Sequence, residues 1–178
     1  KNVAEYRKRM LAAPVRDGKA VLEELSGQYK TEDGDDETDR WDEGAGEMEG
    51  GYENCCFSGL RDFGSRMTGS LILARIPVKN PWEIFAFLPF GNWNECPDTP
   101  ELMAAAKYWF EHYGAVPAVM TNDELEFELL SPVPEEKAME AAAEQYGFCP
   151  YLDQNGDGTI GSLADVLRQS TVWYFWWD

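Results

Sequence analysis

Apolar residues follow a helical repeat near the N-terminus. From Asn2 to Ala13 and from Gly18 to Lys30 they recur every three to four positions, with a break at Pro14, which predicts two short helices. The segment from Thr31 to Glu53 differs, because it holds eleven acids, one base and five glycines. This composition is typical of a linker or a long loop.

Two apolar runs rich in β-forming residues open the C-terminal part. Residues Leu71 to Ile76 and Trp82 to Leu88 are punctuated by prolines and predict two strands. A helix start follows at Asp98-Thr99-Pro100-Glu101, where a capping side chain, a proline and an acid stand in the favoured order. We expect this helix to end at Gly114.

The rest of the chain alternates between strand and helix patterns. Residues 115–120 and 124–130 predict a hairpin, and a helix is expected from about Pro134 to Tyr146. A short helix should start at Ser162, where Ser162 and Asp165 match a capping box. The final run, Thr171 to Trp177, is apolar on both sides and predicts a central strand.

This order, β-β-α-β-β-α-α-β, predicts an α+β fold. We expect an α/β sandwich in which helices pack on a mixed sheet of about five strands. Residues 1–68 would form a helical segment with an acidic Gly-rich loop, and residues 69–178 a compact domain. The length of 178 residues and the apolar share of 44% suit one domain with an appendage.

The net charge of the chain limits the classes of partner that it can bind. The 33 acids and 15 bases give a formal net charge of −18, which disfavours binding to nucleic acid or to an anionic membrane and suits a basic protein. No apolar run is long enough to span a membrane, and the N-terminus lacks the apolar core of a signal peptide. We therefore expect a cytoplasmic protein with reduced cysteines.

Acidic side chains alternate along one predicted strand. Glu124, Glu126 and Glu128 alternate with apolar residues, so the sequence predicts three carboxylates on one outer face. This stripe would bind a basic partner. The alternative interpretation is that it only keeps an exposed sheet face solvated.

A cysteine before a predicted helix is the candidate nucleophile. Cys96 lies near the positive end of that helix, which lowers the pKa of a thiol, and Asn94 stands in the same turn. A cysteine nucleophile also needs a base, and His112 is the only histidine. In the alternative interpretation Cys96 is a packed thiol, Asn94 holds the turn and His112 lies at the edge of the core.

The segment from Asp153 to Ile160 matches the start of a calcium-binding EF-hand loop. Asp153, Asn155 and Asp157 occupy ligand positions, but Ala164 stands where a bidentate carboxylate should close the site. The sequence therefore predicts weak calcium binding at most. The alternative is a polar turn that leads into the next helix.

Four separated motifs resemble one bacterial family. They are FGNWNECP at 90–97, YGA at 113–115, AAEQYGFCP at 142–150 and WYFWWD at 173–178. Over residues 69–178 the chain is similar to domain-of-unknown-function family 4253. The resemblance implies a bacterial cytoplasmic α/β domain without an established activity. It marks as pattern positions Gly91, Trp93, Asn94, Cys96, Glu144, Tyr146, Cys149 and Trp177.

Three functional hypotheses follow. The leading one is a non-enzymatic acidic binding protein without a cofactor, an immunity or inhibitor protein for a basic partner, because opposite charges speed association. The second is an enzyme with a site around Asn94, Cys96 and Glu144. The third is a weak calcium-binding module.

Overall fold

The computed structural model describes residues 2–29, 46–58, 72–150 and 159–177, which form an α+β fold. Its sheet consists of β1 (Val116–Met120), β2 (Glu124–Glu128) and β3 (Val172–Trp176). Both neighbouring pairs are antiparallel, and β2 lies in the middle. The predicted α+β class is confirmed. The described residues show three antiparallel strands instead of about five in a mixed sheet, and β3 is not central among them.

Both apolar runs predicted as the first two strands adopt other structures. Residues 72–79 belong to no helix or strand, and Ile72 and Leu73 are almost fully exposed. The second run forms the short 3₁₀ helix η2 (Pro81–Glu83) and the helix α4 (Ile84–Phe87). Short apolar runs do not distinguish strand from helix by periodicity. Here a capping box between Asn80 and Glu83, with Pro81 at the first position, favours the helical start.

The helix predicted after residue 98 is confirmed as α5 (Thr99–Tyr113). The Asp98 side chain accepts from the Glu101 backbone N–H at 3.0 Å, and the Glu101 side chain accepts from the Asp98 N–H at 2.8 Å. Gly114 ends the helix in the left-handed region, at φ 73°. Capping signals thus fixed both ends of α5.

Helices α6 (Glu135–Phe148) and α7 (Ile160–Leu167) follow the hairpin. The predicted capping box at Ser162 is wrong, because Thr159 caps α7 and its hydroxyl accepts from the Ser162 N–H at 3.0 Å. Asp165 accepts instead from the Gly51 N–H at 2.9 Å and from Arg168 Nε at 2.6 Å. Asp165 therefore ties α7 to the segment around Gly51.

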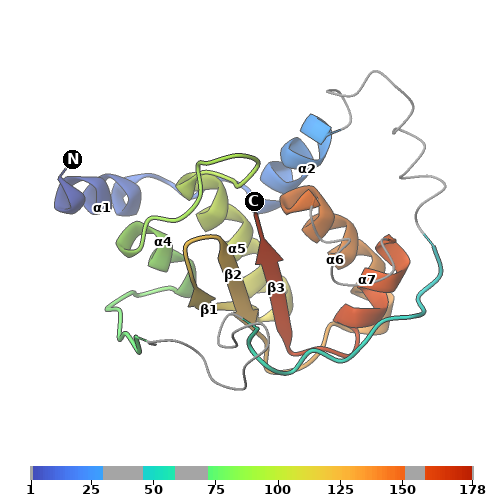
Figure 1. Ribbon diagram of the computed structural model, residues 1–178. Helices are drawn as coiled ribbons and strands as arrows, with labels where there is room; N and C mark the ends of the chain where they lie inside the picture. The colour runs from blue at the N-terminus through green and yellow to red at the C-terminus, as the bar shows by residue number, and fades with distance from the viewer. Residues whose placement is uncertain (1, 30–45, 59–71, 151–158, 178) are drawn as a thin grey trace.

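The two N-terminal helices, α1 (Val3–Ala12) and α2 (Gly18–Tyr29), attach differently to the body. Helix α1 has no buried residue and lies at one end of the molecule, far from α6 and α7 (Figure 1). Helix α2 packs on α5 and α6 and buries Val21, Leu22 and Leu25 in the common core. Close approach of α2 to α6 requires Gly147, since a Cβ there would overlap Ser26.

Aromatic rings fill the core between the helices and the sheet. Trp109 is fully buried and stacks on Phe175 with ring centroids 5.5 Å apart. Phe148 and Phe127 meet Trp109 edge-on at 4.8 and 5.7 Å. In the described part of the chain, no helix combines the length and apolarity needed to cross a membrane.

Candidate functional site

A half-buried carboxylate near the end of α6 is held by donors from α5. The Tyr108 hydroxyl donates to Glu144 Oε1 at 2.7 Å, and the Trp109 indole donates to Oε2 at 3.2 Å. The Tyr113 hydroxyl donates to Oε2 at 3.4 Å. Because one helix supplies all three donors, the Glu144 carboxylate is oriented before any ligand arrives.

Helical spacing explains this meeting of α5 and α6. Glu144 stands three positions after Ala141 and four before Phe148, and both of these residues are fully buried. It therefore lies at the edge of the buried face of α6. Trp109 and Tyr113, four positions apart on α5, present their donors on the facing side.

Burial and hydrogen bonding act in opposite directions on Glu144. Burial raises the pKa of its carboxyl group, while the bonds from Tyr108 and Trp109 lower it, and the net pKa is raised. Burial, together with Glu144 itself, also raises the pKa of Tyr108 and Tyr113. Both phenols therefore keep their protons and remain donors to the carboxylate.

A hollow of about 510 Å³ opens beside this carboxylate, between α2 and α6. This volume lies in the range of small-ligand sites, roughly 300–1,000 Å³. Its lining combines four uncharged residues with four charged ones: Leu22, Ser26, Gly27 and Ala143 with Lys19, Glu23, Glu140 and Glu144. We call it the α2/α6 hollow.

Carboxylates dominate the charge of the α2/α6 hollow. Lys19 Nζ lies 3.0 Å from Glu140 Oε1, and this bond, with the nearby charges of Glu144 and Glu23, raises the pKa of the ammonium group. The three carboxylates outnumber this one ammonium. The hollow is therefore suited to a cationic group such as an ammonium or a guanidinium.

The predicted candidates Glu144 and His112 come together through Tyr108. The His112 ring lies over the Tyr108 ring with centroids 4.0 Å apart, and His112 Nδ1 is 2.8 Å from the Tyr108 carbonyl oxygen. Tyr108 bonds in turn to Glu144. The histidine is exposed on the last turn of α5.

A family model described as a domain of unknown function, DUF4253, matches residues 72–178, more than half of the chain. The chain belongs to the DUF4253 family. This confirms the resemblance seen in the four motifs, with the match beginning close to the expected boundary. Searches of curated proteins and of solved structures find no match.

Three of the eight pattern positions of the DUF4253 domain, Cys96, Cys149 and Trp177, are buried in its interior. Cys149 and Trp177 are fully buried, and the Cys149 thiol donates to the Trp176 carbonyl oxygen at 3.2 Å. At Gly91, with φ 81°, a Cβ would overlap the Pro97 carbonyl oxygen. Glu144 differs from these positions because its side chain also lines a hollow. The other wall comes from α2, outside the matched residues.

The second predicted site of the DUF4253 domain lies around Cys96 and Asn94. Its surroundings do not activate the Cys96 thiol. Cys96 is buried, and burial, Cys149 and Glu101 together raise the pKa of its thiol. The thiol is therefore protonated near neutral pH and lacks the thiolate of a nucleophile. Asn94 is exposed in a turn with φ 44°, as a turn-holding residue requires.

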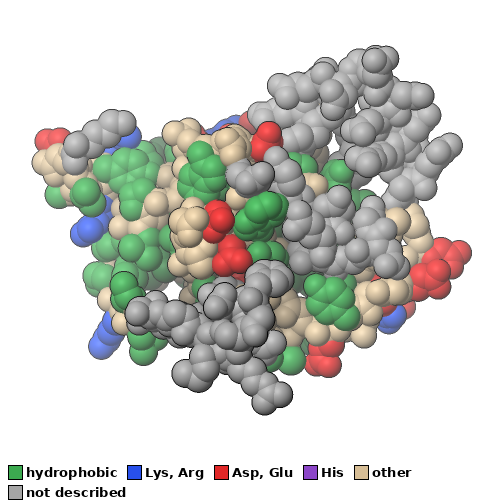
Figure 2. Space-filling view, in the orientation of Figure 1, with side chains coloured by type: hydrophobic (Ala, Val, Ile, Leu, Met, Phe, Trp, Pro, Cys, Tyr) green, Lys and Arg blue, Asp and Glu red, His purple; other side chains and the backbone are tan. Residues whose placement is uncertain are grey.

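The predicted acidic stripe on β2 is not uniformly exposed. Glu128 faces solvent, but Glu126 is fully buried and accepts from the Ser58 N–H at 2.9 Å. Glu124 is half-buried and accepts from the Tyr174 hydroxyl at 2.8 Å. The expectation of three solvent-facing carboxylates is wrong for Glu126, which is fully buried and bonded to the Ser58 N–H. Across the face shown in Figure 2, acidic side chains are scattered and do not form one block.

The predicted calcium ligands Asp153, Asn155 and Asp157 lie outside the described residues. Over residues 2–29, 46–58, 72–150 and 159–177, no group of three or more His, Cys, Asp or Glu side chains is arranged to hold a metal ion.

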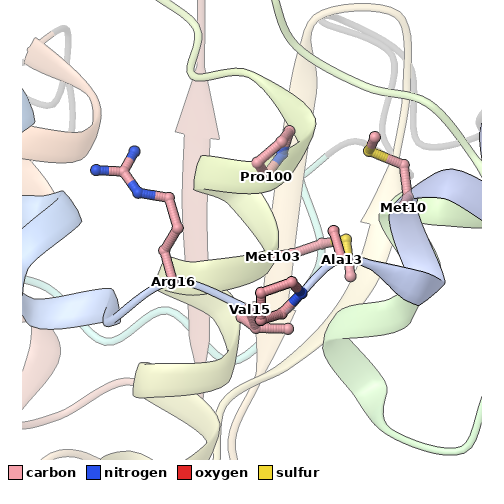
Figure 3. Close-up of a pocket in the computed structure, with 7 residues that line it drawn as sticks. Met10, Ala13, Val15, Arg16, Pro100 and Met103 are labelled. Atoms are coloured by element: carbon pink, nitrogen blue, oxygen red, sulfur yellow. The ribbon is translucent and has the colours of Figure 1, made fainter.

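A smaller hollow lies where the α1–α2 connection meets α5 (Figure 3). Met10, Val15 and Met103 line it, and its volume of about 30 Å³ equals the share of one water molecule in the liquid. The guanidinium of Arg16 points away from these apolar residues. We interpret this hollow as imperfect packing of the connection.

The sequence pointed to Glu144 but missed its surroundings. Tyr108, Trp109 and Tyr113 look like part of an ordinary buried helix face, and Lys19 and Glu140 like ordinary surface charges. Their meeting depends on how α2, α5 and α6 pack. The signal available in the sequence was an acid inside an otherwise Ala-rich helix face, together with Trp109 and Tyr113 four positions apart on another helix.

Proposed function

We propose that this DUF4253 protein is a non-enzymatic acidic binding protein of the bacterial cytoplasm. Its α2/α6 hollow receives a cationic side chain of a basic partner protein, which the chain neutralises as an immunity or inhibitor protein. The observation that carries this proposal is the pre-oriented Glu144 carboxylate beside a hollow in which carboxylates outnumber ammonium groups.

The chemistry of the hollow favours an ammonium or guanidinium group. Three donors already occupy part of the acceptor capacity of Glu144, two at Oε2 and one at Oε1, so Oε1 keeps a lone pair for a donor from outside. A bound cation would also form charge-assisted bonds with Glu140 or Glu23, which share the lining. Leu22 and Ala143 offer apolar contact to the stem of a lysine or an arginine.

The charge of the whole chain supports the same partner class. At a net charge of −18 the protein attracts a basic protein over long range and speeds its association. The raised pKa of Cys96 supports a binding role over thiol catalysis, because a protonated, buried thiol is a poor nucleophile.

Calorimetric titration with an arginine-rich peptide tests the proposal. The matched control peptide has citrulline in place of each arginine, which keeps the shape and removes the charge. We expect saturable binding of the arginine peptide only, with affinity falling between about 50 and about 300 mM salt as screening increases. The protein variant Ala143→Phe fills the hollow without changing the charge and should weaken binding of the arginine peptide. Equal binding of both peptides, or an unchanged affinity of Ala143→Phe, would refute the proposal.

A further inference from the structure

Two neighbouring thiols are presented on the surface before the DUF4253 domain begins. Cys55 and Cys56 are both exposed, and their Sγ atoms lie 4.0 Å apart. Cys96 and Cys149, in contrast, are buried. Reagents in solution therefore reach Cys55 and Cys56 first.

The backbone on both sides of this pair is fixed to the sheet. Asn54 accepts through its carbonyl oxygen from the N–H groups of Thr171 and Val172, both at 3.1 Å, and its side chain donates to the Val172 carbonyl oxygen at 3.2 Å. Beyond the pair, the Ser58 N–H donates to Glu126 at 2.9 Å. The two thiols are thus displayed by an anchored segment.

The spacing of the two thiols suits a bridging atom better than a direct bond. Adjacent Cα atoms are about 3.8 Å apart, below the usual range of about 4.4–6.8 Å in disulfides. A bridging atom that forms a bond of about 2.3 Å to each sulfur, with an angle of about 120° between the two bonds, holds the sulfurs about 4.0 Å apart. This is the observed distance between the Sγ atoms of Cys55 and Cys56.

We propose that Cys55 and Cys56 together chelate one thiophilic ion, of the class formed by copper(I) and trivalent arsenic. Soft thiolate sulfur is the ligand that such ions prefer. In the described parts of the chain no third protein ligand completes a metal group. In this proposal solvent or a thiol from outside fills the remaining coordination position, and the bound ion stays accessible for transfer.

Phenylarsine oxide is a suitable probe for a pair of neighbouring thiols, because its arsenic forms two bonds to thiols. Both S–H bonds break, two As–S bonds form, and the oxygen leaves with the two protons as water. Arsenic remains trivalent, so no oxidant or reductant is needed. A chelate held by two thiols resists displacement by a single thiol, since the second sulfur stays at high effective concentration.

The test uses the full chain and three variants, Cys55→Ser, Cys56→Ser and the double variant, with circular dichroism to verify the fold. We expect the native protein to retain one arsenical in excess glutathione and release it to dithiothreitol. Each single variant should lose the arsenical at a glutathione concentration at least about tenfold lower. Retention by the double variant equal to that of the native protein would overturn the proposal, as would no retention by the native protein.

A second titration identifies the ion. Copper(I) is supplied as its coloured bicinchoninate complex, and withdrawal of one equivalent by the native protein but not by the double variant would assign a metal ion. Retention of the arsenical without copper withdrawal would assign a trivalent metalloid. Both results support chelation by the pair.

Discussion

Glu126 and Glu144 are both carboxylates withdrawn from solvent, yet they serve different purposes. Glu126 on β2 is fully enclosed and accepts from the Ser58 N–H, so its bonds hold the 54–58 segment on the sheet. Glu144 on α6 is also held by donors but lines a hollow of about 510 Å³. Under the proposed function, access to a hollow, and not burial alone, distinguishes a binding carboxylate from a structural one.

The largest expected effect concerns the buried member of the β2 stripe. Glu126→Ala should lower the free energy of unfolding by roughly 2–3 kcal/mol, because it removes the acceptor of the Ser58 N–H and opens a cavity at a fully buried position. Glu128→Ala, at an exposed position of the same strand, should change it by less than about 0.5 kcal/mol. Urea unfolding measures both. Equal losses in the two variants would contradict the difference in burial.

A pair of tyrosine variants gives the next largest effect. Tyr108→Phe removes a hydroxyl group that donates to Glu144, beside the hollow, at 2.7 Å. Tyr174→Phe removes a hydroxyl group that donates to Glu124, on the sheet, at 2.8 Å. Each should cost about 1 kcal/mol in the free energy of unfolding. Binding of the arginine peptide should weaken in Tyr108→Phe alone. Equal weakening in Tyr174→Phe would move the binding site toward the sheet.

The pH dependence of the free energy of unfolding tests the raised pKa of Glu144. Burial raises its folded-state pKa above the ordinary value of 4.5, so between these two pKa values the folded protein holds a proton that the unfolded chain has lost. The stabilising contribution of this proton is complete below the ordinary pKa and is lost as pH rises through the folded pKa. Relative to Glu144→Gln, the native protein should therefore lose stability as pH rises. A constant difference in urea unfolding across this pH range would contradict the raised pKa.

A small change in stability is expected for the lysine of the hollow. Lys19→Gln breaks an exposed ion pair with Glu140, so the free energy of unfolding should change by less than about 1 kcal/mol. Removing this positive charge should nevertheless strengthen binding of the arginine peptide. Calorimetry measures the affinity, and weaker binding would show that Lys19 does not compete with the ligand.

Local signals in the sequence predicted those parts of the fold that depend on neighbours along the chain. The ends of α5 were predicted because Asp98, Glu101 and Gly114 act within one or two turns. The run from Trp82 to Leu88 was wrongly assigned to a strand, because a short apolar run does not distinguish strand from helix by periodicity, and the local capping box between Asn80 and Glu83 was overlooked. Alternation likewise predicted which face of β2 carries the acids but not that Glu126 would be fully buried and bonded to the Ser58 N–H.

Only one residue of the candidate site, Glu144, was predicted from the sequence. Glu144 stood out within a motif of the resembled family, whereas its partners come from α5 and from α2, 31 and more positions away. Contacts over such separations depend on packing, which periodicity within a helix does not specify. The family match agrees with the motif-based prediction but covers only one wall of the hollow.

The most direct test compares the affinity of the arginine-rich peptide for Glu144→Gln and Glu128→Gln. Each variant removes one negative charge, so long-range attraction falls equally in both. We predict a loss of at least about tenfold for Glu144→Gln, the worth of one charge-assisted hydrogen bond, and a change within about twofold for Glu128→Gln. Equal losses in the two variants, or a larger loss in Glu128→Gln, would contradict recognition in the α2/α6 hollow.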